Sequence, residues 1–77
     1  PERIAQLLQT LKQQRDSIKA TDGQVRSSML AARSSIAARD FAAAKTSLDQ
    51  AISVLETRIA VKQQVNATLK ELLALLG

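Results

Sequence analysis

Ala38-Arg39-Asp40-Phe41 is the stretch that decides the fold, because the helical phase of the apolar residues changes there. The side-chain oxygen of Asp40 can cap a helix that follows it. A connection this short leaves the two flanking helices as antiparallel neighbours. The sequence therefore predicts an all-α antiparallel helical hairpin with coiled-coil-like packing.

Apolar residues on both sides of this stretch recur at alternating spacings of three and four, as they do along one face of a helix. Before it the series is Ile4, Leu8, Leu11, Ile18, Val25, Met29, Ala32 and Ile36. After it the series is Phe41, Leu48, Ile52, Leu55, Ile59, Leu69, Leu73 and Leu76. We expect a helix over 2–38 and a second over 41–76, within a single domain that spans 1–77.

Gly23 is the one helix breaker inside the chain, since Pro1 and Gly77 stand at its ends, where they suit a helix start and a helix stop. Thr21-Asp22-Gly23-Gln24 also fits a capping box. The apolar phase nevertheless runs through it. We therefore favour one long first helix, bent near Gly23, over two separate helices; a break over 21–24 would give a three-helix bundle instead.

Folding the chain at Arg39-Asp40 pairs residues whose numbers add to about 77, so that Met29 meets Leu48 and Val25 meets Ile52. Charges flanking this seam support the same register. A basic row recurs every seven residues in the first half, at Lys12, Lys19, Arg26 and Arg33. We expect hairpin salt bridges from Arg26 to Asp49 and from Lys19 to Glu56.

The second helix carries another apolar stripe beside its seam, wider than a two-helix seam needs. Its members are Val54, Val61, Val65, Leu72 and Leu75. Leucines also gather at the open end of the hairpin, including Leu7 and Leu76. We expect these seven residues to form a protein interface, either by self-association to a four-helix homodimer or against a partner helix.

Arg15, Lys62 and Asn66 interrupt the predicted seam with polar side chains. The two long cations can extend out of the seam into water, in which case Asn66 fixes the register. The other interpretation is a contact for an anion or an acidic partner.

Composition narrows the function. The chain has 77 residues, a net charge of +4, no Cys, His or Tyr and thirteen alanines, so it lacks the usual metal ligands and most general acid-base groups. We expect no enzyme, no cofactor and no metal site. No apolar run approaches the ~20 residues of a membrane span, and the apolar sector lacks the aromatic residues of a membrane-surface helix.

The sequence thus predicts a non-enzymatic helical protein-protein interaction module, which could serve as an oligomerisation, adaptor or chaperone-like domain. The alternative is a small basic hairpin that binds the RNA or DNA backbone, which the scattered acids and the missing aromatic residues disfavour. The compartment stays open, with the cytoplasm favoured. A first residue that is proline rather than methionine suggests a processed chain or an excised domain.

Overall fold

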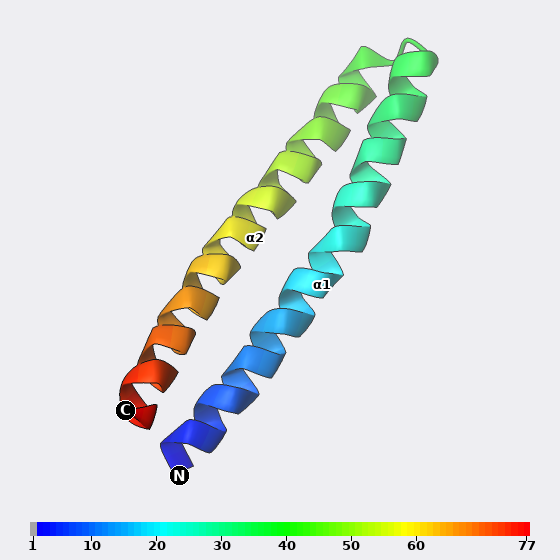
Figure 1. The fold of residues 1–77 in the computed structure, drawn as a ribbon. Coiled ribbons are helices and arrows are strands. Elements are labelled where there is room, and N and C mark those ends of the chain that lie inside the picture. Colours follow the sequence, from blue (N-terminus) through cyan, green and yellow to red (C-terminus); the bar gives the residue numbers. More distant parts are fainter. Residues whose placement is uncertain (1) are drawn as a thin grey trace.

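Two long helices make up the fold. The computed structural model describes residues 2–77, as α1 (Glu2–Ala37) and α2 (Phe41–Leu76). The helices run antiparallel along each other's length, so that both ends of the chain lie at the same end of the hairpin (Figure 1). The predicted all-α hairpin is confirmed. Pro1, expected at the start of the first helix, lies outside the described residues.

The turn is built from residues that satisfy the backbone of both helix ends. Arg39 has a positive φ of 59°, and its N–H donates to the carbonyl of Ile36 at 3.0 Å. The N–H of Asp40 reaches the carbonyl of Ser35 at 2.8 Å, which completes a Schellman motif. The Asp40 carboxylate then accepts from the N–H of Ala43 at 3.2 Å, as predicted for the cap of the second helix.

Gly23 does not interrupt α1, which is helical from Glu2 to Ala37. The favoured single long first helix is therefore confirmed, and the possible break over 21–24, with its three-helix alternative, is absent. The hydroxyl of Thr21 donates to the carbonyl of Ile18 at 2.6 Å and is buried, so it does not form the expected capping box. A single glycine costs a helix only about 1 kcal/mol relative to alanine, which packing along the hairpin can offset.

Gly23→Ala should therefore stabilise the hairpin. A Cβ at this position would meet no atom within 4 Å, so alanine gains helix propensity without a clash. We expect the free energy of unfolding to rise by about 0.5–1 kcal/mol in urea titrations followed by circular dichroism. Ala20→Gly, at an exposed position of the same helix, is the matched control and should lower it by a similar amount. A loss of stability in Gly23→Ala would contradict a regular helix through this residue.

The seam between the helices is built largely from small and polar residues. We use the term seam for the buried and half-buried residues that recur at heptad positions a and d. Position a is counted from Ile4 in α1 and from Ala44 in α2, and position d from Leu7 and Ser47. On α1 these are Ile4, Leu7, Leu11, Gln14, Ile18, Thr21, Val25, Ser28, Ala32 and Ser35. On α2 they are Ala44, Ser47, Ala51, Val54, Arg58, Val61, Val65, Thr68 and Leu72.

This seam corrects the predicted pairing. Leu8, Met29, Leu48 and Ile52, which were expected to face one another between the helices, are exposed. In α1 the prediction was partly right, since Ile4, Leu11, Ile18, Val25 and Ala32 do lie in the seam. In α2 it placed the bulkier apolar row inside, whereas the structure has the smaller row there. Seam residues such as Ala32 and Ala44 suit two helices that pack closely against each other.

The hairpin leaves much surface uncovered for its mass. Its Cα atoms extend over 57 × 14 × 12 Å with a radius of gyration of 17.5 Å, against about 11–12 Å for a compact domain of this length. Its accessible surface is 5838 Å², whereas a compact protein of 8.3 kDa exposes about 4,600 Å². The excess exceeds the roughly 800 Å² that each partner contributes to a standard protein interface.

Candidate interaction surface

The two sides of the hairpin differ because of how the helices are oriented. In each helix, position e follows the seam residue d, and position g precedes the seam residue a. In an antiparallel pair the e rows of both helices lie on one side of the seam and the g rows on the other. Arg3 and Glu71, both at g, form an ion pair of 2.8 Å across the second side.

One side of the hairpin carries most of the exposed bulky side chains. Eleven of the thirteen large apolar residues most exposed among residues 2–77 occupy position e or the adjacent position b, and their exposed fractions run from 43% to 73%. We call this set the apolar face: Leu8, Met29, Ile36, Phe41, Leu48, Ile52, Leu55, Ile59, Leu69, Leu73 and Leu76.

The opposite side has the reverse composition. Its rows, at positions g and c of both helices, contain alanine, serine, threonine, glutamine, Arg3 and Glu71, and no leucine, isoleucine, valine, methionine or phenylalanine. A hairpin that simply faced water would need no such difference between its two sides. Exposed apolar surface gathered on one side of a soluble fold is typical of a binding surface.

Charged residues cross the apolar face near its middle. Arg58 lies in the α2 seam and makes an ion pair with Asp22, which is at position e of α1. Arg15 and Lys62 also occupy e positions and are exposed. We call these four residues the charged belt. It separates the apolar residues near the turn from those near the open end.

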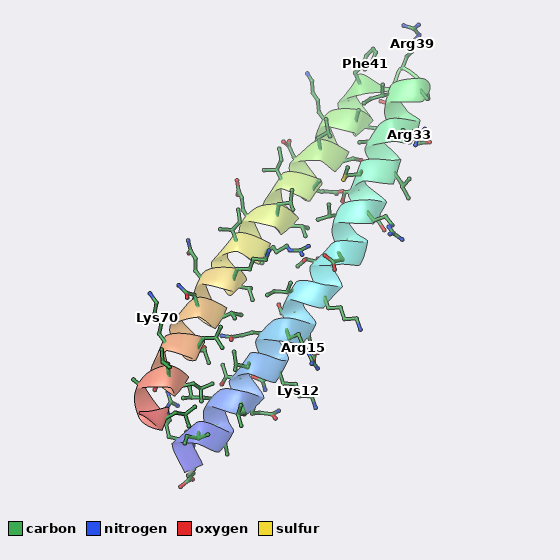
Figure 2. The ribbon with its side chains drawn as sticks, in the orientation of Figure 1. Lys12, Arg15, Arg33, Arg39, Phe41 and Lys70 are labelled. Carbon is green, nitrogen blue, oxygen red and sulfur yellow. The ribbon has the colours of Figure 1, made fainter. Side chains whose placement is uncertain are left out.

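The basic row of α1 borders the apolar face. Lys12, Lys19, Arg26 and Arg33 are exposed at position b, and Figure 2 shows Lys12 and Arg33 well separated along α1. The ion pairs within residues 2–77 are Arg3 with Glu71, Arg15 with Asp16, and Arg58 with Asp22. No member of the basic row is therefore paired with a carboxylate.

The predicted salt bridges from Arg26 to Asp49 and from Lys19 to Glu56 are accordingly absent from the described part of the chain. Asp49 and Glu56 lie at position f of α2, on the outer border of the hairpin. The reason is that a different apolar row of α2 faces α1 from the one that was predicted. This rotation of α2 turns its acids away from α1, so they do not reach the basic row.

Of the residues predicted as an outer interface, some lie in the seam and others are exposed. Leu7 and Leu72 are only 3% and 8% exposed and pack in the seam, so a partner of the intact hairpin cannot cover them. Val54, Val61 and Val65 are half-buried along the same seam. Leu75 and Leu76 are exposed near the open end. Most of the α2 stripe that was expected to face outward therefore faces α1.

Arg15, Lys62 and Asn66 were predicted to interrupt the seam, but all three are exposed outside it. Arg15 makes an ion pair of 3.9 Å with its neighbour Asp16. The polar residues that do cross the seam are different ones. The side-chain amide of Gln14 donates to the hydroxyl of Thr68 at 3.2 Å, and Arg58 pairs with Asp22.

Two shallow hollows lie along α1 beside the apolar face. One is lined by Leu8, Leu11, Lys12 and Arg15. The other is lined by Arg26, Met29, Leu30 and Arg33. Each hollow combines two aliphatic side chains with two cations, which is a surface suited to an amphipathic ligand that carries negative charge.

No group of three His, Cys, Asp or Glu side chains within residues 2–77 is arranged to hold a metal ion. Neither helix is long and apolar enough to cross a membrane. Comparison with models of known protein families, with curated proteins and with solved structures found no match.

Proposed function

We propose that this chain is a non-enzymatic helical interaction module that binds protein through its apolar face. The observation that carries the proposal is the asymmetry of the hairpin: bulky apolar residues are gathered on one side and absent from the other. Because the seam buries few large side chains, the hairpin gains by burying this face against further helices. Of the seven interface residues predicted from the sequence, this proposal keeps Leu76 and replaces the other six by the rest of the apolar face.

Site-specific photo-crosslinking tests this proposal in the cells that make the protein. A photoreactive residue replaces Ile52 on the apolar face, and in a second variant it replaces Ala60, which is exposed on the opposite side. We expect protein adducts of defined mass from position 52 and few from position 60. Equal yields from the two positions, or adducts from position 60 alone, would contradict a function carried by the apolar face.

A further inference from the structure

The charges around the apolar face indicate which kind of partner can bind there. We propose that the apolar face binds one amphipathic helix of another protein, and that this helix carries acidic residues along the side of its apolar stripe that faces α1. This proposal rests on the proposed function and adds the chemistry of the partner. Helices that lie in a groove between two others bury residues at spacings of three and four, which fits a face formed by two parallel apolar rows.

Positive charge that no acid of the other helix neutralises gathers around the apolar face. Seven cations lie on the apolar face or along its α1 border: Lys45 at position b of α2, and six nearer α1, namely the basic row, Arg15 and Lys62. None of them makes a cross-helix ion pair within residues 2–77. A ligand helix lying on the α1 side of the face would bring its flanking residues close to these cations. Carboxylates at those positions neutralise them, whereas lysine or arginine would be repelled.

The spacing of the cations adds detail. The basic row repeats every seven residues, or about 10.5 Å along a helix. A ligand helix packed alongside would match it with acids that also recur every seven residues. Arg15 and Lys62 lie within the face itself, so that a further carboxylate near the middle of the ligand helix would lie between them.

A second copy of the chain fits less well. Any face-to-face dimer brings together two sets of Arg15 and Lys62 and doubles the excess positive charge. Asp49 and Glu56 on the border of α2 match only part of a partner's basic row. The uncovered area alone would allow a dimer, but opposed like charges disfavour it.

A lipid surface also fits less well. The charged belt crosses the middle of the apolar face, where insertion would carry Arg15, Asp22, Arg58 and Lys62 towards hydrocarbon. Phe41 is the only aromatic residue of the chain and lies at the turn end of α2 (Figure 2), so the face lacks the aromatic anchors of interfacial helices.

Two designed helical peptides of about 25 residues test the proposal, because a helix of this length spans roughly 38 Å of the face. Both carry the same leucine stripe; one has glutamates and the other lysines at the flanking positions. We expect the full chain to bind the glutamate peptide at least tenfold more tightly in fluorescence anisotropy at low salt. The preference should shrink as salt screens the charges.

Matched variants locate the charge effect on the apolar face. Arg15→Gln with Lys62→Gln should weaken binding of the glutamate peptide about tenfold. Gln13→Glu with Gln64→Glu makes the same change in net charge at exposed positions of the opposite side and should change binding less than twofold. Circular dichroism of each variant confirms that the hairpin is folded before binding is compared.

The remaining outcomes overturn the proposal in distinguishable ways. Equal binding of the two peptides would show an apolar face without preference for acids, and the proposed function would stand. A stable dimer in sedimentation equilibrium that excludes both peptides would identify a second copy as the occupant. Tight binding to phosphatidylglycerol vesicles with no binding to either peptide would identify lipid, and the proposed protein-binding function would then fail as well.

Discussion

Ala51→Asp should strongly destabilise the hairpin, whereas Ile52→Asp, one residue along, should leave its stability nearly unchanged. Ala51 is 7% exposed in the closely packed seam, and Ile52 is 52% exposed on the apolar face. Aspartate at position 51 would place a carboxylate between the helices with no cation to pair it, in space that suits a methyl group. We expect a loss of about 3 kcal/mol or more, against a total stability of roughly 4–12 kcal/mol for a chain of this length.

Ile52→Asp removes a much larger apolar side chain and should still change the free energy of unfolding by less than about 0.5 kcal/mol, because the position faces water in the single hairpin. Helicity by circular dichroism and the urea midpoint measure both variants at a concentration where the chain is monomeric. The reverse ranking, with Ile52→Asp unfolded and Ala51→Asp folded, would show that the bulky row of α2 lies in the seam after all.

The same pair of residues shows what the sequence could predict. The turn followed from local chemistry, since a phase change next to Asp40 requires only a cap and a short connection. The order of the helices followed from the turn. It was harder to predict which row of α2 faces α1, because Ala51 and Ile52 belong to two different rows and both rows keep helical spacing.

Bulk was the wrong criterion for choosing between these rows. The α2 seam combines alanine, serine and threonine with Val54, Val61 and Val65. These residues are smaller than those of the other row and let two helices pack at close range, and the larger residues beside them then remain for other contacts. One sequence signal pointed the right way: the side formed by positions g and c has no bulky apolar residue at all. A seam formed by the smaller row accounts for the lack of bulky apolar residues on that side. The seam predicted from the bulkier row does not account for it.

Gly23 left a different question open, namely whether the first helix breaks. Its effect on a helix is local and small, and the uninterrupted apolar phase through it was the stronger evidence. Asp22 and Arg58 could not have been paired from the sequence, because their contact depends on the rotation of α2 about its own axis. The charged belt therefore emerged only once the seam was known.

Arg58→Leu should make the hairpin more stable, although it removes the ion pair with Asp22. The Arg58 side chain is 28% exposed in the seam, and Asp22 is 61% exposed. Asp22 left alone is hydrated at little cost, while leucine adds apolar contact between two turns of the α2 seam. Ion pairs in partly buried positions often contribute less than an apolar residue of similar volume. We expect a gain of about 1–2 kcal/mol in the free energy of unfolding, or roughly 4–8 °C in Tm for each kcal/mol.

Asp22→Asn is the matched control, because it leaves Arg58 in the seam without its carboxylate. It should lower the free energy of unfolding by about 1 kcal/mol, and Arg58→Leu should restore stability in the double variant. A large loss of stability in Arg58→Leu alone would instead show that the hairpin depends on this pair. A gain would mean that the pair does not hold the hairpin together. The role to test for Arg58 would then be recognition of an acidic partner helix at the charged belt. The test is whether Arg58→Leu weakens binding of the glutamate peptide.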